Sequence, residues 1–285
     1  LLGSAYTTGV HLGSNNQIAV IAKHFPGFGA SDRPLHEEVP TVRKSLEQLR
    51  QIELAPFFAV TGGAARPEAV ADGLLTTHIR YQGFQGNIRA TTNPVSLDPL
   101  ALAALMEQAE LKSWRQAGGL IVSDALGVRA VERFYGQDQG FPHRVVAKDA
   151  FLAGNDLLYL ADYALGDAPY EAQLANIIDT ILWFQERYNT DVAFKQQVDT
   201  AVLRILQLKL RLHNNSFTSD TILTALDEAL PEASSQGEAV SIDVAQAGIT
   251  LIAPDPNELL ERLVRPPSAN ENILIFTDMH EYQQC

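Results

Sequence analysis

The sequence predicts an α/β protein whose strands run parallel to one another. Four short apolar runs, at residues 18–22, 73–77, 119–122 and 156–160, alternate with segments in which apolar residues recur at helical spacing. This alternation is typical of βα units, in which a helix connects each strand to the next parallel strand. The composition agrees with a globular chain, since 46% of the 285 residues are hydrophobic and 19% are charged.

Helical patterns follow each of the first three runs. Residues 41–60 carry apolar side chains at near-helical spacing behind Thr41, a residue type that caps helix N-termini. Residues 99–115 and 143–152 repeat the pattern. Two long amphipathic helices are expected between residues 169 and 212, where isoleucine, leucine and valine recur on one face.

A change in composition after residue 213 predicts a domain boundary. The chain becomes rich in Ser, Thr, Asn and acidic residues, with Pro231, and we assign residues 214–245 to a linker. Residues 1–213 then form the first domain. Residues 246–285 form the start of a second α/β domain, because 272–277 has the pattern of an apolar strand.

The N-terminal residues have the character of an internal segment. Leu1 is not an initiator methionine, and residues 1–12 already have the composition of a helix. We therefore expect the sequence to be part of a longer protein, truncated at its N-terminus.

Charge and cysteine content exclude several classes of function. The net charge is −13, whereas nucleic-acid binders concentrate Lys and Arg to displace counterions, so we expect no nucleic-acid partner. The single cysteine, Cys285, allows no intrachain disulfide and no cysteine zinc site. No segment reaches the roughly 20 apolar residues of a membrane span, and no His-x-His pair ends a strand. We expect no membrane span in these residues, no metal and no cofactor.

Reactive side chains gather where the apolar runs end. Lys23 and His24 follow the first run, His78 the second and Asp124 the third. In a parallel α/β architecture, the carboxyl ends of the strands and the loops after them meet on one face, where barrel enzymes place their active sites. We therefore expect these four side chains to lie near one another.

These residue types suit sugar chemistry. A retaining glycosidase needs a carboxylate that attacks the anomeric carbon, a group that protonates the leaving oxygen, and donors that hold the sugar hydroxyls. Asp124 can be the nucleophile, and Lys23 and His24 can be donors. Other interpretations remain open: Asp124 could cap the helix after its strand, Lys23 and His24 could form a solvated turn, and His78 could be a core histidine.

Four motifs occur in order along the chain. Residues 23–29 read Lys-His-Phe-Pro-Gly-Phe-Gly, 77–78 read Thr-His, 119–124 read Gly-Leu-Ile-Val-Ser-Asp, and 153–156 read Ala-Gly-Asn-Asp. Together they resemble glycoside hydrolase family 3, and above all its β-N-acetylhexosaminidase branch. The resemblance covers residues 1–165 well.

The resemblance implies a fold and a set of roles. In this family the catalytic domain is a TIM-type (β/α)₈ barrel that begins well before the Lys-His motif. The four runs then correspond to strands five to eight, the C-terminal half of the barrel, followed by helices and, at 272–277, the start of an α/β sandwich domain. By position Asp124 matches the nucleophile, Lys23 and His24 match residues that bind sugar hydroxyls, and His78 is a further candidate for substrate binding.

The proton donor departs from the family pattern. The hexosaminidase branch uses an Asp-x-His pair on the loop after the Lys-His motif; here the histidine falls on His36, but Pro34 stands where the aspartate is expected. Asp32, four residues before His36, could supply the charge if the loop folds back. Glu37 or Glu38 could instead serve as a carboxylic acid. In other branches the acid is a glutamate of the second domain, which would lie beyond the last residue of this chain.

One hypothesis and one alternative follow. We expect a glycoside hydrolase that cleaves O-glycosidic bonds of β-linked N-acetylglucosaminides or glucosides by a retaining mechanism. Asp124 is then the nucleophile, and His36 with Asp32 forms the acid/base pair. The alternative is a catalytically impaired family 3-like barrel that binds carbohydrate or serves as a scaffold, because Pro34 replaces the partner of the acid. In both cases the expected partner is a carbohydrate.

Overall fold

The computed structural model describes residues 1–35, 37–136, 140–216 and 235–249, together with four isolated residues, Thr218, Asp255, Glu258 and Ser268. The chain divides into two compact units, residues 1–223 and 224–285. The described helix of the second unit is α12 (Ser235–Gly248). The expected strand at 272–277 lies outside the described residues.

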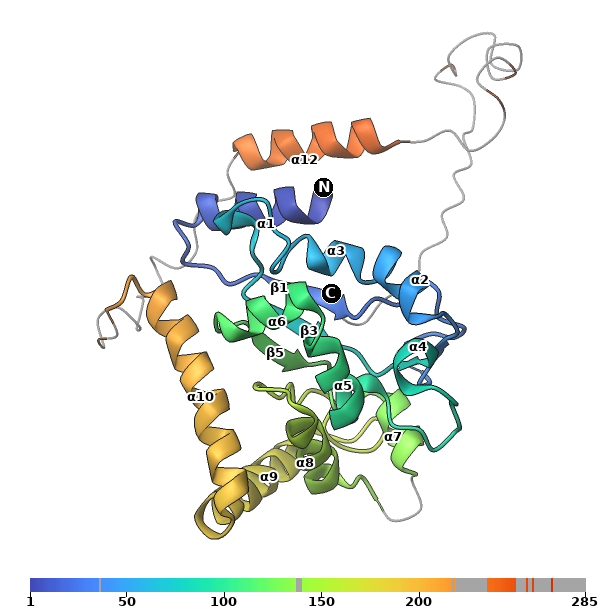
Figure 1. The fold of residues 1–285 in the computed structure, drawn as a ribbon, viewed down its shortest axis with the longest axis vertical. Coiled ribbons are helices and arrows are strands. Elements are labelled where there is room, and N and C mark those ends of the chain that lie inside the picture. Colours follow the sequence, from blue (N-terminus) through green and yellow to red (C-terminus); the bar gives the residue numbers. More distant parts are fainter. Residues whose placement is uncertain are drawn as a thin grey trace. The chain divides into compact units, whose positions relative to one another are not determined.

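A three-stranded parallel sheet lies at the centre of the first unit (Figure 1). Its strands, β1 (Ile21–Phe25), β3 (Gly73–Thr76) and β5 (Leu120–Ser123), pair in that order. The register sets Phe25 beside Thr76 and Thr76 beside Ser123, so the three strands end at the same level. The predicted α/β class with parallel strands is confirmed.

The fourth apolar run does not form the strand predicted at 156–160. It runs parallel to β5 through a single isolated bridge between Val122 and Leu157. Further along, the N–H of Tyr159 bonds to Oγ of Ser123, at 2.9 Å, rather than to a backbone carbonyl. A side-chain hydroxyl thus takes the place of a backbone carbonyl as the acceptor, which interrupts the regular hydrogen bonding to β5. The predicted strand is therefore reduced to a single bridge.

The helix predicted at 41–60 is also different in the structure. Thr41 does not cap a helix, because β2 (Thr41–Val42) pairs in parallel with β4 (Arg80–Tyr81). The helix α2 (Leu46–Gln51) begins later, where Ser45 and Gln48 form a capping box. The helical pattern breaks again before α3 (Ala55–Phe58), which holds Pro56 in its first turn. Proline is tolerated there but breaks a helix interior.

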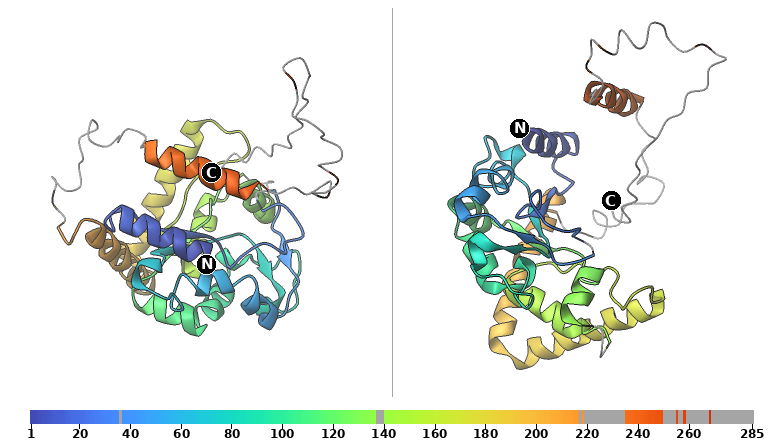
Figure 2. Two further views of the ribbon diagram at one scale, coloured as in Figure 1. Left: turned by 90° about the horizontal axis from the view of Figure 1, so that it is seen from above. Right: turned by 90° about the vertical axis from the view of Figure 1, so that its right-hand side faces the viewer.

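The other described helices include two that the sequence patterns did not predict, at Gln82–Gln85 and Arg129–Tyr135, and the helix predicted at 99–115 is divided in two. In chain order, the other helices are α1 (Leu2–Gly13), α4 (Gln82–Gln85), α5 (Pro99–Met106), α6 (Ala109–Gln116), α7 (Arg129–Tyr135), α8 (His143–Ala153), α9 (Tyr170–Thr190) and α10 (Val192–Leu212), with 3₁₀ turns at Pro67–Ala69 and Val95–Leu97. The helices between the strands, α2, α3, α5 and α6, lie along the same side of the sheet (Figure 2). Among the described helices, none is long and apolar enough to cross a membrane.

The apolar core fills the space between the sheet and these helices. Leu74 of β3 and Ile121 of β5 are buried there with Phe57, Leu105 and Trp114 from the helices. The apolar side chains are thus buried beside the strands, while the strand ends carry the polar residues.

Candidate active site

The carboxyl ends of β1, β3 and β5, which carry the predicted site residues, lie side by side in the sheet. Lys23 and His24 belong to β1, His78 follows β3 and Asp124 follows β5. Backbone bonds hold these ends side by side: the N–H of Thr77 lies 2.9 Å from the carbonyl of Phe25, and the N–H of Asp124 lies 2.9 Å from that of Thr76. The parallel pairing therefore brings the three segments together, although Lys23 and His24, expected after the first strand, lie within β1.

Asp124 is held by two donors. Its carboxylate is buried, with the residue 6% exposed; Oδ2 accepts from the hydroxyl of Thr77 at 3.1 Å, and Oδ1 accepts from the N–H of Ala125 at 2.9 Å. It does not cap the next helix, since α7 begins only at Arg129, with Val128 at its N-cap. The capping interpretation of Asp124 is therefore excluded. The two donors fix the orientation of the carboxyl group at the end of β5.

His78 lies deeper than a residue that simply lines a pocket. It is 2% exposed, with Nδ1 2.7 Å from Oγ of Ser96 and Nε2 3.0 Å from the carbonyl of Ala125. Because a carbonyl only accepts, Nε2 donates, and the ring supports the backbone next to Asp124. Direct contact of His78 with substrate stays a prediction, and the geometry favours a supporting role.

Lys23 and His24 lie near the carboxyl end of β1, just before the loop that follows it. Lys23 is exposed and His24 is half-buried, its ring in edge contact with Phe28 at 5.4 Å between centroids. The peptide bonds between Lys23 and His24 and between Phe25 and Pro26 are cis. Gly27 has φ of +104°, and a Cβ there would stand 3.0 Å from both Cβ and the carbonyl oxygen of Glu53. Only glycine accommodates this close approach without strain.

The comparison with protein families decides the identity of the fold. A family model described as the glycosyl hydrolase family 3 N-terminal domain matches residues 1–208. The chain belongs to glycoside hydrolase family 3. The family predicted from the four motifs is thereby confirmed.

Individual relatives agree with this assignment. A beta-hexosaminidase of Pseudomonas aeruginosa is 33% identical over 81 residues, which are 28% of this chain and 21% of that protein. A beta-hexosaminidase of Idiomarina loihiensis is 26% identical over 165 residues, 58% of this chain and 42% of that protein. The structure of a family 3 beta-N-acetylglucosaminidase from Paenibacillus sp. str. FPU-7 has the same fold, with a TM-score of 0.62 at 24% identity over 87% of this chain and 41% of that chain. The chain spans less than half the length of each of these proteins.

The loop of the predicted family 3 acid/base pair is described on both sides of His36. Asp32 is exposed, and its Oδ1 accepts from the N–H of Thr41 at 2.8 Å, which ties the start of the loop to its end. His36 itself lies outside the described residues, so its pairing with Asp32 stays a prediction. The two alternative acids contact arginines: Glu37 lies 3.5 Å from Arg129 and 3.3 Å from Arg133.

The second alternative acid, Glu38, pairs with Arg33 on the same loop. Both alternative acids are thus paired with arginines of the loop and of α7. The role of either glutamate as proton donor stays a prediction.

A buried polar cluster behind the Lys-His loop was missed at the level of sequence. Glu53, whose backbone contacts Gly27, forms an ion pair with Lys44, and its side chain is 3% exposed. Its Oε2 and the hydroxyl of Tyr81 have no hydrogen-bond partner among the described residues. Burial, and then the charge of Glu53, raises the pKa of Tyr81 well above its usual range. No sequence signal points to this cluster, because Glu53 lies within the helical pattern expected at 41–60 and outside the four motifs.

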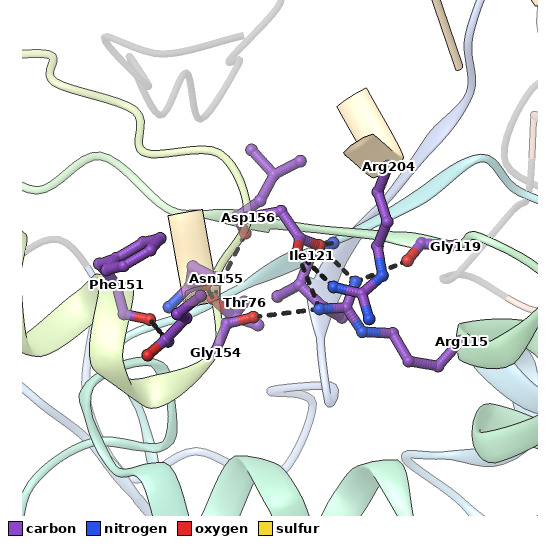
Figure 3. A network of polar contacts seen from close by, with 11 residues as sticks. Thr76, Arg115, Gly119, Ile121, Phe151, Gly154, Asn155, Asp156 and Arg204 are labelled. Atoms are coloured by element: carbon purple, nitrogen blue, oxygen red, sulfur yellow. Dashed lines mark hydrogen bonds and ion pairs between the residues drawn. The ribbon is translucent and has the colours of Figure 1, made fainter. Parts of the chain in front are cut away.

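At the opposite, amino ends of the strands, buried aspartates form ion pairs with arginines (Figure 3). Asp156 accepts from Arg115 at 2.9 Å, from Arg204 of α10 at 3.1 Å, and from the N–H of Ile121 at 2.9 Å. Arg211, two turns after Arg204, pairs in the same way with a second buried aspartate, Asp72, which also contacts His11 of α1. These contacts lie at the amino ends of the strands, the face associated with stability rather than catalysis.

Proposed function

We propose that this chain provides the nucleophile of a retaining glycosidase that acts on β-linked N-acetylglucosaminides or glucosides. The observation that carries the proposal is the placement of Asp124, a buried carboxylate fixed by Thr77 and Ala125 at the carboxyl end of β5. The beta-hexosaminidases among its relatives support the same class of substrate.

The chemistry needs two steps. Asp124 attacks the anomeric carbon and forms a glycosyl-enzyme ester while a proton passes to the leaving oxygen. Water then hydrolyses the ester, so that the anomeric configuration is retained. We assign the proton transfer to His36 with Asp32, and the grip on the sugar hydroxyls to Lys23 and His24.

We also infer a position within the complete barrel. The order β1-β3-β5, extended by the bridge at Leu157, supports strands five to eight of a (β/α)₈ barrel. The division into a half-barrel with its helices at 1–213, a linker at 214–245 and the start of a second α/β domain at 246–285 is part of the same proposal.

The test replaces Asp124 with Asn in the complete protein. Hydrolysis of 4-nitrophenyl β-N-acetylglucosaminide is expected to fall roughly a thousandfold or more, because an amide in place of the Asp124 carboxylate cannot form the ester. The matched control is Asp199→Asn on α10, an exposed aspartate that bonds only to Tyr188 among the described residues. Equal turnover in Asp124→Asn and Asp199→Asn would remove Asp124 from the mechanism.

A covalent label distinguishes the enzyme from a barrel that only binds sugar. A fluorinated β-glycoside that slows hydrolysis of the ester should add one glycosyl group to the peptide containing Asp124, detected by mass spectrometry. Carbohydrate binding without this adduct would instead identify the non-catalytic alternative.

The assignment of His36 as the proton donor can be tested with substrates that differ in their leaving groups. His36→Gln should slow substrates with poor leaving groups, such as disaccharides, far more than nitrophenyl glycosides, which leave without a proton. An equal loss on both would exclude His36 as the proton donor.

A further inference from the structure

Tyr159 lies on the segment that runs parallel to β5, beside the proposed nucleophile. Its N–H donates to Oγ of Ser123 at 2.9 Å, and its carbonyl accepts from the N–H of Leu126 at 3.0 Å. Ser123 and Leu126 lie on either side of Asp124 in the sequence. The backbone of Tyr159 therefore passes alongside Asp124 at roughly the spacing of neighbouring strands, about 4.8 Å.

The side chain of Tyr159 is directed away from the apolar core. Leu158 and Leu160 pack against the apolar cluster around α7 and α8, whereas Tyr159 is 48% exposed. Successive side chains of an extended segment point to opposite faces. Tyr159 therefore lies on the open face of the sheet, which is the face opposite the helices.

The register of the strands carries this face past the strand ends. One row of side chains on it, each more exposed than the residues on either side, consists of Leu75, Val122 and Leu157. Two residues further along the three segments, the next row consists of Thr77, Asp124 and Tyr159. The 3.1 Å contact between Thr77 and Asp124 shows that this second row is formed. Thr77 and Asp124 are buried, so Tyr159 is the exposed member of the row.

We propose that the ring of Tyr159 forms an apolar floor under the sugar ring that Asp124 attacks, and that it selects the configuration of that sugar. The inference rests on the glycosidase activity proposed above. In the chair form of a β-linked N-acetylglucosaminide, the face opposite the leaving group carries the axial hydrogens of C1, C3 and C5. Asp124 attacks from this face, and Tyr159 stands next to Asp124. The electron-rich face of an aromatic ring attracts such C–H groups.

The contact predicts selection at C3 of the sugar. N-acetylallosamine differs from N-acetylglucosamine only in an axial hydroxyl at C3, which points to the face that Asp124 attacks. This hydroxyl would occupy the space over the ring of Tyr159 and lose its hydration without gaining a partner. The complete protein should therefore have a higher kcat/KM for the 4-nitrophenyl β-glycoside of N-acetylglucosamine than for that of N-acetylallosamine.

The test replaces Tyr159 with Leu, which is apolar but has no ring, and with Phe, which keeps the ring. Tyr159→Leu should lower kcat/KM for the glucosaminide about tenfold, the size expected for one aromatic contact, and reduce the preference over the allosaminide. Tyr159→Phe should keep both values within about twofold of wild type. The matched control is Tyr6→Leu on α1, a 71% exposed tyrosine, which should keep both values.

Two results would overturn the proposal. If the ring only packs against other parts of the complete protein, Tyr159→Leu will lower the unfolding temperature while the ratio of kcat/KM between the two epimers stays at its wild-type value. If Tyr159→Phe loses as much activity as Tyr159→Leu, the phenol hydroxyl makes the contact and the ring does not form a floor.

A binding measurement separates this inference from the proposed function. The methyl β-glycosides of N-acetylglucosamine and N-acetylallosamine are titrated into the Asp124→Asn protein and into Asp124→Asn with Tyr159→Leu. If the wild-type protein hydrolyses neither nitrophenyl glycoside but the glucosaminide binds about tenfold more weakly without the ring, the glycosidase proposal fails and the sugar floor stands. Equal results for the glucosaminide in the two proteins, including no binding to either, would overturn the floor itself.

Discussion

The hydroxyl of Thr77 donates to Oδ2 of Asp124 over 3.1 Å, linking the ends of two neighbouring strands in a buried setting. Thr77→Val keeps the shape of the side chain but leaves Oδ2 without this donor. The expected result is a fall of about tenfold in kcat/KM on aryl β-glycosides, because the carboxylate loses its fixed orientation. Thr77→Ser retains the hydroxyl and should restore most of the rate. Wild-type kinetics in Thr77→Val would show that Asp124 needs no such support.

The ion pair between Lys44 and Glu53 is expected to contribute much more to the free energy of unfolding than an exposed ion pair does. Glu53→Gln leaves the ammonium group without its partner and should lower the free energy of unfolding by about 3 kcal/mol in urea denaturation. Lys44→Met should cost a similar amount. The double variant should be more stable than the sum of the two losses predicts, since the charges depend on each other.

The exposed pair between Lys112 and Glu107 provides the control for this cycle. Its side chains are 48% and 67% exposed, and Glu107→Gln should change the unfolding free energy by less than about 1 kcal/mol. Equal losses in Glu53→Gln and Glu107→Gln would contradict a buried anchor behind the Lys-His loop.

Asp156 should be a stability residue. Asp156→Asn removes the charge that Arg115 and Arg204 share and should destabilise the protein by about 3 kcal/mol, measured as a lower midpoint of urea denaturation. Once folded, the variant should retain nearly wild-type kcat, because the pairs lie at the amino ends of the strands. A large loss of kcat in a stable Asp156→Asn protein would instead connect this cluster to the site.

The stability of the first unit should depend on Asp179 in a pH-dependent way. Hydrogen bonds from Arg144, then from His143, hold the pKa of Asp179 far below its ordinary value. A carboxylate with a depressed pKa stabilises the fold above its unfolded pKa of about 4, and that stabilisation is lost as the pH falls through the folded pKa.

The unfolding temperature of Asp179→Asn should therefore be slightly below wild type at pH 7. The difference should be small because the group is exposed, and it should shrink as the pH falls below about 4. A difference that is constant across this pH range would rule out the ionised carboxylate as its cause.

Local sequence patterns predicted the strands that alternate with helical segments. They missed the elements whose pairing partners are distant in the sequence. The runs that became β3 and β5 alternate with helices as βα units require, and both were found close to their observed bounds. The pattern of 41–60 did not reveal β2, because Thr41 pairs with Arg80, a partner 39 residues away in the sequence. The same limit applies to 156–160, where the hydroxyl of Ser123 interrupts the ladder.

The sequence by itself determined the family, the parallel α/β class and the position of Asp124 at a strand end, because these depend on motifs and periodicity along the chain. The tertiary structure decided what surrounds that carboxylate. It placed Thr77 beside Asp124, turned His78 inward onto Ser96, and buried Glu53 beneath Gly27. It also placed Arg33 of the loop after β1, Arg80 of β4 and Arg133 of α7 around one cleft. Burial and charge depend on neighbours distant in sequence, and only folding brings those neighbours together.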